Sequence, residues 1–113
     1  MILVCFWDMQ QRPSRYCLRQ LAEQAEQLKE KGVIIVAVQA SEVEQASLSE
    51  WIQKYGIPFP VGLVETGAEG TRLAWGVRSL PWLILTDSKH VVVAEGFQLS
   101  ELDEKIAKGV NHD

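Results

Sequence analysis

The feature that most constrains the fold is a pair of short apolar runs separated by an amphipathic helical segment. Residues 2–7 and 33–38 are rich in the β-branched and aromatic side chains that favour buried strands. Between them, Pro13 suits the first turn of a helix and Gly32 suits its end. The apolar positions of this helix recur at helical spacing and are Cys17, Leu21, Ala25 and Leu28. Two strands joined in this way run parallel, with a right-handed crossover.

The rest of the chain predicts a helical insertion followed by two more strands and a helix. Residues 47–50 read SLSE, which has the form of a capping box, and Gly56 ends the helix that follows. Residues 61–64 predict a short strand, and residues 71–75 predict a short helix before Gly76. Residues 82–86 and 91–95 predict a hairpin that turns at 87–90, and Ser100 would cap a final helix. We therefore predict an α/β fold with a mixed sheet and helices on both faces.

Composition limits the classes of function. A chain of 113 residues with 47% hydrophobic residues fits one domain, residues 1–113, with a real core. The first strand begins directly after Met1, so we expect a domain excised from a longer protein. A net charge of −4 argues against nucleic acid or an anionic membrane as a partner, and no apolar run is long enough to span a bilayer. His90 and His112 have no second ligand in view, so we expect neither a metal nor a cofactor.

Three segments resemble the thioredoxin family. Residues 2–15, ILVCFWDMQQRPSR, align without a gap with the strand that leads into the family's Cys-x-Pro-Cys loop. Residues 74–81, AWGVRSLP, are similar to the Tyr-Gly-Val-x-x-x-Pro string that ends in a cis-proline, and residues 56–61, GIPFPV, look like the insertion of the redoxin branch. That branch includes AhpC/TSA and TlpA-like thiol–disulfide proteins. The resemblance implies a thioredoxin-like three-layer α/β/α sandwich, in the extracytoplasmic part of a membrane-anchored bacterial protein.

The active-site loop departs from the family pattern. The loop reads Gln11-Arg12-Pro13-Ser14, so an amide and a hydroxyl stand where the resemblance places the two redox cysteines. Cys5 stands at the strand position where many thioredoxins have a buried acid. Thiol–disulfide exchange requires an attacking thiolate and a second thiol that resolves the mixed disulfide. We therefore expect the dithiol oxidoreductase activity to be absent.

Two interpretations remain open for Cys17. It could be a displaced redox thiol, or a small apolar residue that begins the buried stripe of the first helix, which is the interpretation we favour. A disulfide with Cys5 requires Cα atoms within about 7 Å. A peroxiredoxin pattern, Pro-x-x-x-Thr-x-x-Cys, fits poorly, because Cys17 and Gln20 occupy its threonine and cysteine positions after Pro13.

Pro81 is the most informative family feature that this chain keeps. In the family the bond before this proline is cis, which exposes the backbone of the preceding residue, here Leu80, beside the active-site loop. An extended peptide can pair with such a backbone by strand addition. The apolar side chains that we expect to contact the peptide are those of Trp7, Met9 and Trp82. Preservation of loop geometry alone would also explain the proline.

Charged residues flank the loop. One interpretation of Arg12, Arg15 and Asp8 is an acidic ligand held at the helix N-terminus, where backbone N–H groups favour anions, but a local ion pair is the simpler expectation. The first hypothesis is therefore a non-catalytic module that binds a peptide or protein in the groove between the loop and Pro81. The alternative is an oxidoreductase or peroxidase that acts through Cys17, and a third possibility is a structural spacer.

Overall fold

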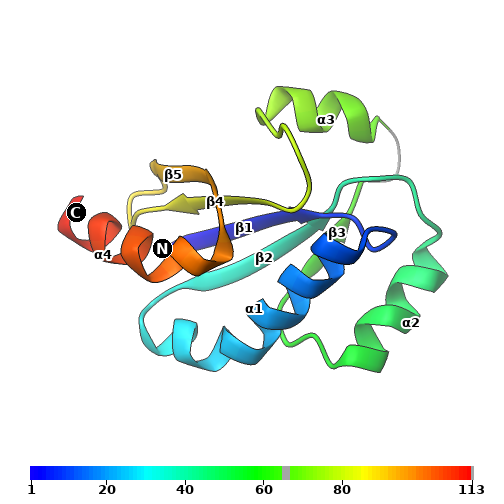
Figure 1. The fold of residues 1–113 in the computed structure, drawn as a ribbon, viewed down its shortest axis with the longest axis horizontal. Helices are drawn as coiled ribbons and strands as arrows, with labels where there is room; N and C mark the ends of the chain where they lie inside the picture. Colours follow the sequence, from blue (N-terminus) through cyan, green and yellow to red (C-terminus); the bar gives the residue numbers. More distant parts are fainter. Residues whose placement is uncertain (65–66, 113) are drawn as a thin grey trace.

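A five-stranded mixed sheet with the strand order β3-β2-β1-β4-β5 forms the centre of the fold (Figure 1). This computed structural model describes residues 1–64 and 67–112, and their side chains as far as residue 110. The strands are β1 Ile2–Trp7, β2 Ile34–Gln39, β3 Val61–Leu63, β4 Trp82–Thr86 and β5 Val92–Phe97. The helices are α1 Arg12–Glu30, α2 Gln45–Tyr55, α3 Ala68–Ala74 and α4 Leu102–His112, and a 3₁₀ turn, Leu99–Glu101, precedes α4. The expected α/β class with a mixed sheet is confirmed, because β1, β2 and β3 are parallel while β4 and β5 are antiparallel additions.

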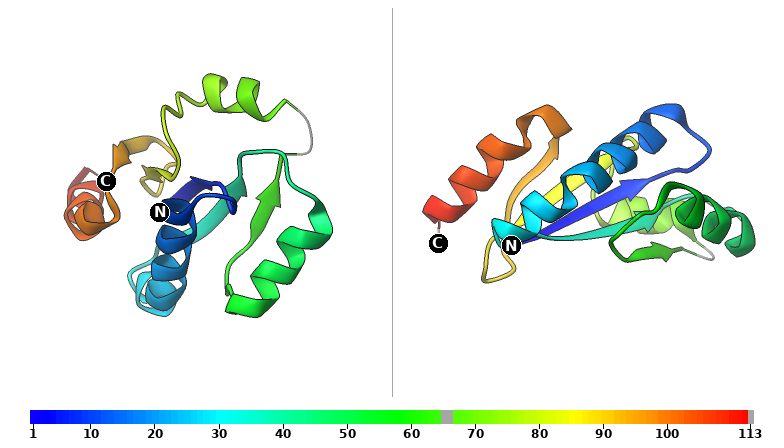
Figure 2. Two further views of the ribbon diagram at one scale, coloured as in Figure 1. Left: turned by 45° about the vertical axis from the view of Figure 1, so that its right-hand side comes forward. Right: turned by 90° about the horizontal axis from the view of Figure 1, so that it is seen from below.

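The helices lie in layers on the two sides of the sheet. In the views of Figures 1 and 2, α1 and α3 lie on opposite sides of the sheet, α4 lies beside β5, and α2 lies at the β3 edge. This arrangement is the predicted three-layer α/β/α sandwich. None of the helices in the described ranges is long and apolar enough to cross a membrane.

Alternation along β1 divides the apolar side chains between two cores. Leu3, Cys5 and Trp7 are fully buried in the larger core, which α1 covers. Phe6 points to the other side, where it packs in a smaller cluster with Ala40 and Ile84. Successive side chains of a strand point to opposite faces, so this division follows from the pleat of β1.

The three glycines predicted to end helices have a left-handed backbone, but both predicted N-caps are wrong. Gly56 is the C-cap residue of α2 with φ of +58°, while Gly32 (φ +80°) and Gly76 (φ +70°) follow the C-cap residues of α1 and α3 respectively. However, α2 begins at Gln45, so Ser47 lies inside the helix. Before α4, Glu101 accepts a hydrogen bond from the backbone N–H of Gln98 at 3.0 Å, so this pair occupies the cap position in place of Ser100. A capping-box pattern does not fix a helix start when tertiary packing extends the helix.

Trp82 packs directly over the backbone of β5. Gly96 in β5 has φ of +68°, and an added Cβ there would lie 2.7 Å from the indole carbon Cη2 of Trp82. Gly56 has a similar φ of +58° but has open space around the position of a Cβ. The two glycines therefore separate the effect of backbone conformation from the effect of close packing.

We expect Gly96→Ala to lower the free energy of unfolding by about 2–4 kcal/mol, because a left-handed backbone and an overpacked contact both add cost. Gly56→Ala should lower it by only about 1–2 kcal/mol, because there the backbone acts alone. Urea unfolding of the two variants beside the parent measures both values. Equal losses would mean that the contact between Trp82 and Gly96 does not constrain the sheet.

Candidate functional site

The resemblance places the family's dithiol motif at residues 11–14, which lie at the N-terminus of α1. Gln11 is the N-cap residue with an extended backbone (φ −110°), and Pro13 lies in the first turn, where its missing N–H costs nothing. Gln11, Arg12 and Pro13 are exposed, whereas Ser14 is 0% exposed. Its hydroxyl has no hydrogen-bond partner in the described part of the chain. The outer position of the motif is therefore accessible and the inner position is buried.

A buried carboxylate holds this loop against the end of β2. Asp8 is 5% exposed, and its Oδ1 accepts hydrogen bonds from the Ser41 hydroxyl at 2.8 Å and the Gln10 backbone N–H at 3.0 Å. The fully buried amide of Gln39 donates to the same oxygen at 3.5 Å, and its Oε1 accepts from the Met9 N–H at 2.8 Å. Residues about thirty positions apart in the sequence thus fix the geometry of the loop.

The expected ion pair in this loop is wrong. Arg15 donates to the backbone carbonyl of Met9 at 3.0 Å, and Asp8 uses the neutral donors described above. Within the described ranges, the ion pairs are Lys31–Asp103 and Lys108–Glu104, both of which involve α4. Packing of the carboxylate among neutral donors therefore leaves the cations near the loop without an acidic partner in those ranges.

A pocket of about 350 Å³ lies between this loop and the segment before β4. The peptide bond between Leu80 and Pro81 is cis. The residues that line the pocket are Asp8, Gln11, Ser41, Arg72, Val77, Arg78, Ser79 and Leu80. We call this pocket the Leu80 groove. It brings Gln11 and Leu80 together, as the sequence predicted, at the N-terminus of α1.

The three apolar side chains predicted to contact a peptide in this groove, those of Trp7, Met9 and Trp82, do not line it. Trp7 is 0% exposed, because alternation along β1 turns its side chain into the larger core. Its ring centroid lies 5.0 Å from that of Trp51, with the two rings tilted. Trp82 packs over Gly96 beside the smaller cluster, and Met9 packs against the larger core. These three side chains therefore have structural roles.

Sequence reasoning missed three polar residues of the groove, Ser41, Arg72 and Arg78. Arg72 comes from α3 and donates to the backbone carbonyl of Ala40, while Arg78 comes from the segment after α3. Arg78 lies inside residues 74–81, which resemble the family's string before the cis-proline. The sequence therefore indicated that Arg78 lies near the loop, but not that its side chain lines the groove. Ser41 and Arg72 gave no signal, because only the folded chain brings them beside the loop.

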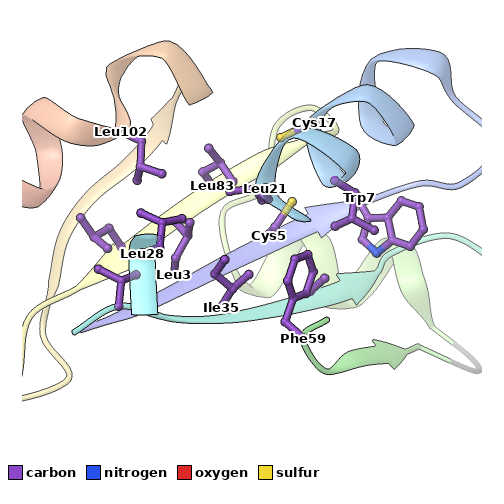
Figure 3. Packing of buried hydrophobic residues seen from close by; sticks show 14 of the residues in the cluster. Leu3, Cys5, Trp7, Cys17, Leu21, Leu28, Ile35, Phe59, Leu83 and Leu102 are labelled. Carbon is purple, nitrogen blue, oxygen red and sulfur yellow. The ribbon is translucent and has the colours of Figure 1, made fainter. Parts of the chain in front are cut away.

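The two cysteines form a buried pair between β1 and α1 (Figure 3). Cys5 is 0% and Cys17 is 6% exposed, which confirms that Cys17 packs in the core. A side-chain hydrogen bond with Cys5 lowers the pKa of the Cys17 thiol from its ordinary value, although burial acts in the opposite direction. The same hydrogen bond, together with burial, raises the pKa of Cys5. The hydrogen bond therefore makes Cys17 the more acidic thiol of the pair, but burial keeps reagents from it.

The hollow, the acidic residues and the histidines elsewhere in the described structure do not form a second candidate site. A larger hollow of about 560 Å³ lies between α1 and residues 58–60, and it contains no residue of the predicted site. No group of three or more His, Cys, Asp or Glu residues in the described ranges is arranged to hold a metal ion. His90 lies in the β4–β5 turn with φ of +64°, and the side chain of His112 lies outside the described residues.

The fold and the loop at the N-terminus of α1 define a thioredoxin-like domain. The family model of the AhpC/TSA family matches residues 1–95, and the chain belongs to this family. Thiol-disulfide oxidoreductase ResA of Bacillus thuringiensis subsp. konkukian (strain 97-27) is 30% identical over 111 residues. The match covers 96% of this chain and 62% of that protein, so the chain spans less than two thirds of its relative. The protein of the same name from Bacillus cereus (strain ATCC 10987 / NRS 248) matches equally well.

Solved structures share the fold at low sequence identity. A thiol-disulfide oxidoreductase from Bacteroides fragilis NCTC 9343 has a TM-score of 0.79 at 18% identity, covering 95% of this chain and 79% of that one. The thioredoxin domain of a thiol-disulfide oxidoreductase from Bacteroides vulgatus has a TM-score of 0.81 at 21% identity, covering 97% and 79%. These likenesses establish the thioredoxin-like fold of this domain.

Because both thiols are buried, we expect iodoacetamide to label neither Cys5 nor Cys17 in the native protein near neutral pH. Both should react once guanidinium chloride unfolds the chain. Mass spectrometry of samples quenched over time measures the labelling, and Gln11→Cys supplies an exposed thiol as the positive control. Rapid native labelling of Cys17, with a pH midpoint below that of an ordinary cysteine, would show an accessible thiolate and contradict the packing role.

Proposed function

We propose that this domain does not exchange disulfides and instead binds an extended peptide segment of a partner protein in the Leu80 groove. The observation that carries the proposal is the composition of the loop at the α1 N-terminus, where Gln11 and Ser14 occupy the positions of the family's redox thiols. Neither side chain can form a mixed disulfide, because neither contains sulfur. Burial of Cys5 and Cys17 supports the same conclusion.

The backbone of the groove supports peptide binding. Leu80 lines the pocket, and among the described residues no backbone hydrogen bond outside helices and strands engages its N–H or carbonyl. It lies two residues before Trp82, where β4 begins pairing with β1. An extended peptide laid beside Leu80 would satisfy these groups by strand addition, and its side chains would alternate into the pocket.

The chain spans 62% of the ResA relatives' length, so we propose that the domain works as one module of a longer protein. Its partner would then be another protein, or another segment of the same protein. In either case the occupant is an extended stretch of polypeptide, and the groove acts through binding alone.

The first experiment tests the loss of chemistry by restoring the motif. With dithiothreitol as the reductant, the parent should reduce insulin disulfides no faster than dithiothreitol alone. Gln11→Cys/Ser14→Cys should be active, because it places one exposed and one buried thiol in the first turn of α1, where the helix N-terminus lowers a thiol pKa. Turbidity of the insulin solution follows the reaction.

The single variant Gln11→Cys is the matched control. It has the exposed thiol but no resolving thiol, so it should form a mixed disulfide without turnover. Reduction of insulin by the parent would overturn the proposal that the chemistry is absent.

The second experiment tests the groove with a displayed library of random heptapeptides. The parent should enrich binders, and Ser79→Trp should lose them, because Ser79 is exposed and lines the pocket that the indole would fill. Ser100→Trp is the control, since Ser100 is an equally exposed serine in the turn before α4. Enrichment that survives Ser79→Trp would locate binding elsewhere, and a parent that enriches nothing would refute peptide binding.

A further inference from the structure

The Leu80 groove has an excess of positive charge. Arg72 and Arg78 both line it, and neither forms an ion pair with an acidic residue in the described ranges. Arg72 donates to the Ala40 carbonyl, which is a neutral acceptor. Two guanidinium groups in one small pocket repel each other unless an anion lies between them.

Among the described residues that line the groove, Asp8 carries the one carboxylate, and it does not compensate both cations. Asp8 is buried, and its Oδ1 already accepts hydrogen bonds from Ser41, Gln10 and Gln39. Within the part of the chain that the structure describes, Asp8 forms an ion pair with neither Arg72 nor Arg78. The N-terminus of the 19-residue helix α1, where Gln11 lines the same pocket, adds partial positive charge. The groove as a whole thus attracts an anion.

The residues and the volume of the groove favour one kind of anion, a carboxylate on a peptide side chain. Leu80 lines the same pocket as the two arginines, and no backbone hydrogen bond outside helices and strands engages its N–H or carbonyl among the described residues. Main-chain pairing and charge recognition can therefore act on one ligand. A volume of about 350 Å³ accommodates one side chain with the backbone on either side of it. The planar fork of arginine matches a carboxylate with two parallel hydrogen bonds.

We infer that the Leu80 groove selects an extended peptide with an aspartate or glutamate side chain at the position that faces Arg72 and Arg78. This inference rests on the proposed function, because it names the class of segment that the groove binds. The carboxylate lies between the two guanidinium groups while the peptide backbone pairs with Leu80. A lysine at the same position is excluded by charge, and a glutamine binds without the ionic contribution.

The test uses three heptapeptide libraries with blocked termini, identical random flanks and a central Glu, Gln or Lys. Because the termini are acetylated and amidated, a preference for Glu reports a side-chain carboxylate and not a chain end. Competition between libraries, read by mass spectrometry of the bound fraction, should favour Glu over Gln by about tenfold and over Lys by more. Raising the salt concentration should reduce this preference.

Arg78→Gln should abolish the preference for Glu over Gln, and Arg78→Lys should keep only part of it, because the charge remains but the fork is lost. Arg19→Gln is the matched control, since Arg19 lies over the ring of Tyr55 and not in the groove. Equal binding of all three libraries would overturn the charge preference and leave peptide binding standing.

Two further outcomes count against the idea. Failure of every library to bind the parent would refute the proposed function together with this inference. Inorganic phosphate serves as a competitor. Displacement of the Glu library by phosphate, with no binding of the Gln library, would identify a small-anion site and overturn the peptide.

Discussion

The buried carboxylate of Asp8 fixes the point at which β1 ends and α1 begins. It gathers the Ser41 hydroxyl, the Gln10 N–H and the Gln39 amide around one oxygen, while Gln39 in turn holds the Met9 N–H. Loss of this acceptor would remove a partner from the partly buried Gln10 N–H and Ser41 hydroxyl, while the Gln39 amide would keep the Ser41 carbonyl as an acceptor. A donor left unpaired in a buried place costs about 1–3 kcal/mol. The N-terminus of α1, and with it one wall of the Leu80 groove, depends on this network.

Alternation along β1 then decides which side chains can take part in function. Cys5 and Trp7 point into the core under α1, so neither a thiol nor an aromatic surface reaches the groove from these positions. Phe6 points to the other face, where its ring centroid lies 5.6 Å from that of Trp75 and the two rings are tilted. Trp75 is still 54% exposed, so α3 covers this face only in part. The residues that line the Leu80 groove are therefore mostly polar, with Val77 and Leu80 as the apolar ones.

The order of strands and helices was predictable from the sequence, because residues 2–7, Gly32 and Gly56 have strong local preferences. Loop length and topology then leave few arrangements for a strand–helix–strand unit. The lining of the groove was not predictable in the same way. Arg72 and Ser41 have no local signature, and they meet the loop only through contacts distant in sequence. Trp7 was misplaced because its position in the motif indicated proximity to the loop, while the strand pleat directs its side chain away.

In the proposed function, the residues that bind a peptide differ from those at which the family's redox chemistry would take place. Of the residues that line the Leu80 groove, Gln11 alone stands where the resemblance places a redox cysteine, while the inner position, Ser14, is buried beneath the loop. Exchange of sulfur for an amide at Gln11 removes a nucleophile, but it adds a hydrogen-bond donor and acceptor at the mouth of the pocket. The backbone of Leu80 and the charges of Arg72 and Arg78 do not depend on either position. The proposed function therefore depends on residues that bind a polypeptide and not on thiols that would react with it.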